Sequence, residues 1–492
     1  MQNYPPLPGA PCNVFVTHLP IHENLQGSRH GGTQRSFAIN FTLHARMIQV
    51  PIRTVSIVTL GCSKNAVDSE VLAGTLARAG LELVSEPEGA DAIVINTCGF
   101  IAAAKEESVN TILEAIELKA AGHTRAVVVA GCLAERYGDE LRKELPEVDL
   151  IVGTEQFSAI ARFLSPDYKY TLVGERVQST PPHYAYVKIS EGCDHPCSFC
   201  AIPLMRGRHR SRPEAEIERE VRRLVSNGVR EIILIGQDTT YYGYDLYRKR
   251  TIADLLRRLL DIEGLQWLRM LYAYPSHFPL EVLDVMRERS NMCKYLDLPL
   301  QHCSTDVLRS MRRGITRRAT EELIATIRER VPGIALRTTF IVGYPTESER
   351  HFDELCRFVE EQRFDRLGVF TYSHEDGTYA EILGDPIPEE VKIARQQTLM
   401  ELQRGISYQR NQALIGTALR AVVDEALPNG EYRCRTEADA PEVDCELYVT
   451  APQKLSVGDF ITAEITDAAE YDLFGTVQCT EDTERATAPA AS

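Results

Sequence analysis

Residues 193–200, Cys193-Asp-His-Pro-Cys197-Ser-Phe-Cys200, place three cysteines in one short loop of a 492-residue chain. The loop follows an apolar segment, residues 185–190, that has the length and composition of a β-strand. A structural zinc site normally has four protein ligands, and only His195 inside the loop offers a fourth. Three thiolates on a [4Fe–4S] cluster leave one iron open for chemistry. The spacing therefore favours a cluster with an open iron over a structural zinc site.

The loop lies at the start of a series of strand candidates that alternate with helical segments. Such alternation predicts a parallel sheet covered by helices. Six βα units are typical of an open or partial barrel, whose chemistry takes place at the carboxyl ends of its strands. The six strand candidates are residues 185–190, 231–236, 268–273, 295–300, 335–343 and 367–373.

A second set of cysteines, Cys62, Cys98 and Cys132, is dispersed over the first part of the chain, 36 and 34 residues apart. Each comes just past the end of a predicted strand. Since parallel strands end at one edge of a sheet, the three thiols can converge there. Free cysteines are often core residues, but the same placement three times favours a second cluster site. The three strand candidates are residues 54–60, 91–96 and 126–130.

These patterns predict an α/β protein with a small all-β domain at its end. Residues 1–52, with four prolines near the start and a polar run, are expected to form a disordered leader. An N-terminal parallel α/β domain is expected over residues 53–170, and a partial (β/α)6 barrel over residues 178–408. Alternating apolar residues predict a small β domain over residues 411–480, and residues 481–492 are expected to be an unstructured tail.

Composition and charge narrow the class of protein. The chain has 13 cysteines and no secretory signal, so metal or redox use is a better expectation than disulfides, and we expect a cytoplasmic protein. No apolar stretch approaches the roughly 18 residues of a membrane span. The net charge of −16 makes a general nucleic-acid binder a poor expectation.

The loop at residues 193–200 resembles the Cys-x3-Cys-x2-Cys signature of the radical S-adenosylmethionine (SAM) superfamily, including an aromatic residue before the last cysteine. The resemblance implies that the three cysteines hold a [4Fe–4S] cluster, whose open iron binds SAM and whose electron cleaves SAM to a radical. It also implies an external electron donor as a partner. The SAM contacts implied at the strand ends are Phe199, Gly236, Gln237, Asp238, Gln301, Ile341 and Gly343.

Two three-cysteine sites followed by a small β domain resemble the methylthiotransferases, which end in a TRAM domain. The marks of this family are Leu-Gly-Cys-Ser-Lys-Asn at residues 60–65, Asn-Thr-Cys-Gly-Phe at 96–100 and Gly-Cys-Leu at 131–133. The resemblance implies that C–H is replaced by C–S–CH3 with two molecules of SAM. It also implies that Cys62, Cys98 and Cys132 hold a second [4Fe–4S] cluster, which delivers the sulfur.

The family divides by substrate, and two features favour a protein over RNA. Residues 411–480 contain 13 acidic and 4 basic residues, a net charge of −9, which should repel RNA and attract a basic protein. Residues 237–240, 439–444 and 471–475 also resemble the branch that modifies an aspartate of ribosomal protein uS12, although Cys445 stands where a small residue such as glycine is expected.

We therefore expect a methylthiotransferase acting on the β-carbon of a uS12 aspartate, with the acidic β domain docking that basic protein. Two alternatives stay open: a tRNA adenosine methylthiotransferase, and a non-catalytic iron–sulfur protein of the ribosome. The sequence names no general acid or base, sulfur source, order of steps or oligomeric state.

Four arginines follow the cluster loop at every second position. They are either a solvated charged run or a contact for an anion, such as the SAM carboxylate or an acidic target. The four are Arg206, Arg208, Arg210 and Arg212.

Overall fold

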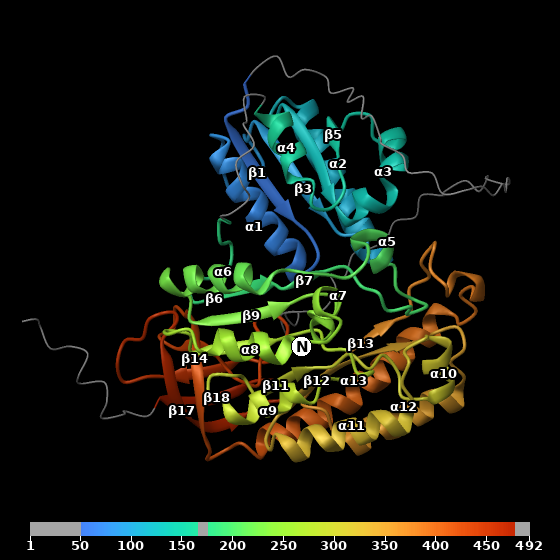
Figure 1. Cartoon of the computed structure of the whole chain (residues 1–492), viewed down its shortest axis with the longest axis vertical. Helices are drawn as coiled ribbons and strands as arrows, with labels where there is room; N and C mark the ends of the chain where they lie inside the picture. Colours follow the sequence, from blue (N-terminus) through green and yellow to red (C-terminus); the bar gives the residue numbers. More distant parts are fainter. Residues whose placement is uncertain (1–50, 166–175, 478–492) are drawn as a thin grey trace, which may run out of the picture.

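The computed structural model describes residues 51–165 and 176–477. The predicted leader, up to residue 50, and the predicted tail lie outside the described residues. Three bodies follow one another along the chain: an α/β domain, a barrel-like domain and a closed β-barrel (Figure 1). In the described part of the chain, no helix is long and apolar enough to span a membrane.

The N-terminal domain is a five-stranded parallel sheet in the order β2-β1-β3-β4-β5. Its central strands are runs of β-branched and alanine residues that are buried on both faces, as parallel strands covered by helices require. The strands are β1 (Thr54–Thr59), β2 (Glu82–Leu83), β3 (Ala92–Thr97), β4 (Ala126–Gly131) and β5 (Leu150–Ile151). The helices are α1 (Ser63–Arg78), α2 (Ala102–Ala120), α3 (Cys132–Glu144) and α4 (Phe157–Leu164).

The second domain holds two three-stranded parallel sheets, ordered β10-β9-β6 and β11-β12-β13. A parallel bridge between Leu268 and Met292 and a bond from Ala273 N to Asp297 O (2.9 Å) join the two sheets, so six strands follow one another in chain order. This open arc is the predicted partial barrel. Its strands are β6 (Tyr184–Lys188), β9 (Glu231–Ile235), β10 (Trp267–Met270), β11 (Tyr295–Asp297), β12 (Ala335–Val342) and β13 (Arg366–Thr371).

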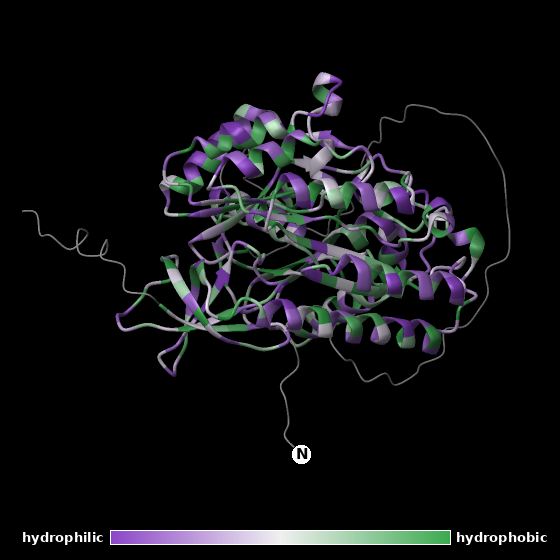
Figure 2. Ribbon diagram, turned by 90° about the horizontal axis from the view of Figure 1, so that it is seen from below, coloured by the Kyte–Doolittle hydropathy of each residue, from purple (hydrophilic) through white to green (hydrophobic). Residues whose placement is uncertain are grey.

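Amphipathic helices cover the outer side of this arc and bury their apolar faces against it. Figure 2 shows hydrophobic residues gathered on the inner strands and mixed with hydrophilic ones on the outer helices. A small hairpin, β7 (Ser190–Glu191) with β8 (Arg210–Ser211), encloses the cluster loop. The helices are α5 (Ile202–Arg206), α6 (Glu214–Ser226), η1 (Thr239–Tyr241), α7 (Tyr244–Tyr247), α8 (Ile252–Leu260), α9 (Glu281–Glu288), α10 (Thr305–Ser310), α11 (Arg317–Arg330), α12 (Glu349–Gln362), η2 (Glu381–Leu383) and α13 (Glu389–Gln412).

The last domain is a closed five-stranded barrel in the order β14-β15-β16-β18-β17. Closure removes the exposed sheet edges that a small β domain would otherwise present. Its strands are β14 (Ala418–Ala426), β15 (Tyr432–Thr436), β16 (Leu447–Thr450), β17 (Phe460–Ala468) and β18 (Leu473–Val477). The α/β class with a final all-β domain, predicted from the sequence, is confirmed.

Part of the acidic charge of the β-barrel is used inside the molecule, which corrects the simple charge argument. Asp439 pairs with Arg366 of β13 at 2.5 Å, and Asp424 lies 2.7 Å from His183. Asp444 accepts a bond from the Tyr295 hydroxyl. Five of the 13 acidic residues contact the preceding domain in this way and are not available to an outside partner: Asp424, Glu437, Asp439, Glu442 and Asp444.

We predict that this docking survives mild acid and fails below about pH 4, the ordinary range of carboxyl groups. Burial alone would raise the pKa of Glu231, but Arg435 and Arg269 outweigh it and hold that pKa below its usual value; Asp424 is lowered similarly, by His183 and Arg435. A lowered native pKa contributes stability that is present above the unfolded pKa and is lost as pH falls through the native one.

The chain's single tryptophan, Trp267, reports this docking, because it is buried against Phe460 of the β-barrel at 4.9 Å between ring centroids. Its fluorescence should stay constant from pH 7 to about pH 5 and change below about pH 4. A transition near pH 6 instead would show that histidine, and not these carboxylates, controls docking.

Candidate active site

The three dispersed cysteines converge at one edge of the N-terminal sheet, as predicted. Cys62 stands just before α1, Cys98 just after β3, and Cys132 at the start of α3. Asn65 ties the three segments together: its Nδ2 donates to the backbone oxygens of Leu60 and Thr97, and its Oδ1 lies 3.8 Å from Cys132 Sγ. Burial raises the pKa of Cys132 to about 11. We call the three cysteines the N-terminal trio.

A glycine makes room for this trio. Gly61 has φ +90°, and a Cβ at this position would lie 2.8 Å from Cys98 Sγ. We predict that Gly61→Ala costs about 1–2 kcal/mol of stability for its backbone and also displaces Cys98, so that iron bound at the trio is lost.

Gly80→Ala is the matched control for Gly61→Ala. Its φ is +82°, but no atom lies within 4 Å of the added Cβ. The two variants should lose similar stability, while only Gly61→Ala loses iron, measured per chain after anaerobic reconstitution. Equal iron content in both would mean that the contact with Cys98 is unimportant.

The cysteines of the loop at 193–200, here the barrel trio, lie at the carboxyl end of β6, with Cys197 buried and the other two half-buried. Arg313 donates to Cys197 Sγ at 3.3 Å, and the Tyr274 hydroxyl lies 3.7 Å from the same sulfur. Burial raises the pKa of Cys193 and Cys200 to about 12. Binding of a metal cluster therefore has to displace protons from these thiols.

His195, the only candidate for a fourth zinc ligand, is engaged elsewhere. Its Nε2 lies 2.6 Å from Asp238 Oδ2, and its ring stacks on Tyr274 at 3.6 Å between centroids. Asp238 Oδ1 in turn accepts bonds from the backbone and hydroxyl of Thr240, the second residue of η1. These contacts hold the loop against the ends of β9 and β10 and leave the barrel trio with three ligands.

The donor set fits clusters better than single ions. Among the described residues, no three His, Cys, Asp or Glu side chains are arranged to hold one metal ion. A [4Fe–4S] cluster does not need that arrangement, because each thiolate binds a different iron. All eleven described cysteines are free thiols, so both trios are available as ligands.

The residues expected to contact SAM fall into separate groups. Phe199 and Ile341 both pack against the apolar cluster around Tyr344. Gln237 donates to Glu191 Oε1 at 2.7 Å, and a Cβ on Gly236 would meet the Ser190 hydroxyl.

Two further expected SAM contacts, Gln301 and Gly343, both have positive φ. The backbone N–H of Gln301 donates to Thr339 O, and its carbonyl accepts a hydrogen bond from Ile341 N. At Gly343 a Cβ would collide with Lys392 of α13, so packing against this helix already requires a glycine, and its contact with SAM stays a prediction.

The four arginines after the loop do not act as one group, and the two alternatives offered for them were incomplete. Arg206 is buried and donates to Asp68 Oδ2 (2.6 Å) and Asn65 Oδ1 (2.5 Å) of the N-terminal domain. Arg210 pairs with Glu155, and Arg212 with Glu220. Arg208 is exposed. Sequence spacing gave no signal for the burial of Arg206, because its partners lie about 140 residues earlier in the chain.

The two trios are neighbours. Cys132 packs against Ala201, Ile202 and Met205, which directly follow Cys200. Figure 1 places the short helix α5 below α3, between the two domains. The N-terminal domain is also held on the other side, where Lys105 and Arg136 both pair with Glu375. Both cysteine sites therefore face one shared junction.

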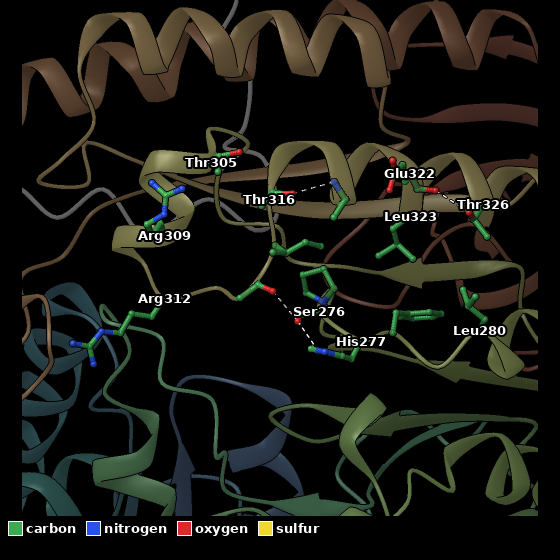
Figure 3. A pocket seen from close by; sticks show the side chains of 15 residues that line it. Ser276, His277, Leu280, Thr305, Arg309, Arg312, Thr316, Glu322, Leu323 and Thr326 are labelled. Carbon is green, nitrogen blue, oxygen red and sulfur yellow. Dashed lines mark hydrogen bonds between the residues drawn. The ribbon is translucent and has the colours of Figure 1, made fainter.

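A hollow of about 790 Å³ lies between the loop after β10 and helix α11 (Figure 3). Ser276 and His277 line one side and Thr316 and Leu323 the other. Neither trio contributes to its lining.

Comparison with known proteins agrees with this geometry. Residues 54–153 match the uncharacterized protein family UPF0004, 187–359 the radical SAM superfamily and 415–477 the TRAM domain. The chain is 54% identical over 426 residues to the ribosomal protein uS12 methylthiotransferase RimO of Cytophaga hutchinsonii, covering 86% of this chain and 97% of that protein. The chain belongs to the RimO family. The RimO protein of Chloroherpeton thalassium is also 54% identical, over 86% of this chain and 98% of its own.

A solved structure supports the fold alone. The radical SAM methyltransferase TsrM of Kitasatospora setae, solved with cobalamin and a [4Fe–4S] cluster, aligns with a TM-score of 0.50 at 16% identity, over 67% of this chain and 74% of that chain. Membership of the radical SAM superfamily implies one [4Fe–4S] cluster and SAM for this enzyme.

Proposed function

We propose that this protein transfers a methylthio group to the β-carbon of an aspartate in ribosomal protein uS12, replacing C–H by C–S–CH3 with two molecules of SAM. One observation carries the proposal: a second cysteine trio faces the same domain junction as the radical-SAM trio, with Cys132 packed against α5, the helix that follows Cys200. A radical enzyme that only abstracts hydrogen has no need of this second site. A methylthiotransferase needs sulfur next to the carbon radical.

The roles of the two trios are those that the family resemblance implies. A [4Fe–4S] cluster and SAM on the barrel trio would supply the radical, and a second cluster on the N-terminal trio would supply sulfur. The protein's own part is to orient and to exclude water. Asp238, through His195, orients the loop of the barrel trio. Arg313 neutralises charge at Cys197.

Exclusion of water is the task of the junction between the first two domains. Glu375, whose side chain is 3% exposed, receives Lys105 and Arg136 of the N-terminal domain. On the other side Lys188 of β6 pairs with Asp68 at 2.5 Å. These buried pairs hold the N-terminal sheet over the carboxyl ends of the barrel strands, where the reaction would take place.

A protein substrate is favoured over RNA even after the charge argument is corrected. Five acidic residues of the β-barrel contact the preceding domain, and Arg435 is buried against Glu231 of that domain. The remaining charged residues of 411–477 are eight acidic residues and three basic ones, Arg420, Arg433 and Lys454. The remaining charge of −5 is unsuited to a phosphate backbone and suited to a basic protein.

The test uses the full chain, reconstituted anaerobically with iron and sulfide and incubated with SAM, a strong reductant and either uS12 or tRNA. We expect methylthio-aspartate in uS12 by peptide mass spectrometry and unmodified tRNA. A modified adenosine with unmodified uS12 would overturn the proposal in favour of a tRNA enzyme. If both clusters form but 5′-deoxyadenosine does not, the protein is a non-catalytic scaffold.

A further inference from the structure

The helix between the two trios ends in a buried charge. Arg206, the last residue of α5, is 5% exposed. Its guanidinium crosses from the barrel domain into the N-terminal domain, where it bonds to Asn65 Oδ1 and Asp68 Oδ2; Cys132 Sγ lies 3.8 Å from the same Asn65 Oδ1. Arg206 thus lies six positions after Cys200 of one trio and shares the Asn65 side chain with Cys132 of the other.

The partners of Arg206 are themselves fixed. Asn65 donates to the backbone oxygens of Leu60 and Thr97, at 2.7 and 3.1 Å, and so ties together the segments that carry Cys62 and Cys98. Its other side-chain atom, Oδ1, accepts from Arg206 at 2.5 Å. A single amide thus joins Arg206 to the loops that carry the other two cysteines of the N-terminal trio.

The surrounding charges balance. Arg206 and Lys188 face Asp68 and Glu191, and Lys188 is 2.5 Å from each of the two carboxylates. All four side chains are nearly buried. In a site of low dielectric, removal of one cation leaves a net negative charge beside the N-terminal trio.

The barrel trio has its own arginine. Arg313, buried, lies 3.3 Å from Cys197 Sγ and also donates to Pro299 O at 2.5 Å. Burial raises the pKa of Cys193, Cys200, Cys98 and Cys132; against this rise, the charge of Arg313 lowers the pKa of the first two and the charge of Arg206 that of the last two. A different guanidinium therefore lies near each trio.

We propose that Arg206 is a positioning residue for the N-terminal site: it locks Cys132 and Asn65 onto α5, and its positive charge sets the reduction potential of the cluster held there. The inference rests on the proposed function only in that the N-terminal trio holds a cluster. The sign follows from electrostatics, because a nearby cation stabilises the more negative, reduced cluster. Loss of the cation should make that cluster harder to reduce.

The experiment isolates the N-terminal cluster in the full chain by replacing Cys193, Cys197 and Cys200 with alanine. In this background Arg206→Met, Arg206→Lys, Arg208→Met and Arg313→Met are compared by EPR-monitored redox titration and by iron content. We expect Arg206→Met to shift the midpoint to more negative potential and to change the EPR signal of the reduced cluster. Arg206→Lys should keep most of the wild-type potential, and the exposed Arg208 and the distant Arg313 should have no effect.

A purely structural role would give a different pattern. If Arg206→Lys shifts the potential as far as Arg206→Met, or if Arg313→Met shifts it equally, the assignment of charge to Arg206 is wrong. Absence of iron from the N-terminal trio with Arg206 intact would instead defeat the proposed function.

A second measurement needs no cluster. Hydrogen exchange of the apoprotein should speed up in Arg206→Met around residues 62–66 and 130–134, and unchanged exchange would overturn the positioning role. This readout holds even if Arg206→Met binds no iron.

Discussion

Replacement of Cys98 by alanine is expected to remove one cluster, to leave the other, and to abolish methylthio transfer. Cys98 belongs to the N-terminal trio, while the barrel trio is held in a separate loop by Asp238 and Arg313. Iron per chain should fall from about eight toward about four, since each cluster holds four. The variant should still form 5′-deoxyadenosine from SAM and reductant but no methylthio-aspartate.

Cys293→Ala is the control for this prediction. Cys293 is as deeply buried as any described cysteine but packs with Tyr295 and Trp267 and belongs to neither trio. Its iron content and product should match the wild type. Retention of about eight irons in Cys98→Ala, or continued product formation, would mean that the dispersed trio is not a cluster site.

The second large effect is expected at Glu231, which joins the barrel domain to the β-barrel. Its carboxylate is fully buried and receives Arg269 at 2.9 Å and Arg435 of β15 at 2.8 Å. Glu231→Gln keeps the shape of the side chain but removes the negative charge that the guanidiniums of Arg269 and Arg435 share. Breaking a buried pair in this way costs about 3–5 kcal/mol.

The loss should appear as an earlier urea transition of Trp267 fluorescence and as proteolysis between α13 and β14. Glu218→Gln is the matched control, because Glu218 pairs with two arginines, Arg222 and Arg258, that are half exposed. Its transition should coincide with the wild type. A similar midpoint for Glu231→Gln would show that Glu231 does not hold the β-barrel in place.

The fold of the first two domains could be predicted from the sequence because both cysteine trios follow the ends of apolar strands. All nine strands predicted in the first two domains are present, and both trios follow their strands as expected. The strands that were missed break the simple pattern. β2 and β5 have only two residues each, too few to show alternation.

Charges buried between domains could not be predicted from the sequence. β15 reads Tyr-Arg-Cys-Arg-Thr: Tyr432 and Cys434 pack in the β-barrel core, and Arg435 lies on the opposite face, where it is buried against Glu231 of the preceding domain. The same effect hid Arg206, whose burial depends on Asp68 in another domain. Five acids of the β-barrel were counted as outward-facing for the same reason.

The central claim is that this chain modifies uS12, and mass spectrometry of ribosomes and tRNA from a deletion strain tests it most directly. The account predicts that the uS12 aspartate loses its methylthio group in the deletion strain, that the wild-type gene restores it, and that the Cys98→Ala gene does not, while the tRNA is unchanged throughout. Loss of a tRNA modification with uS12 still modified would contradict it.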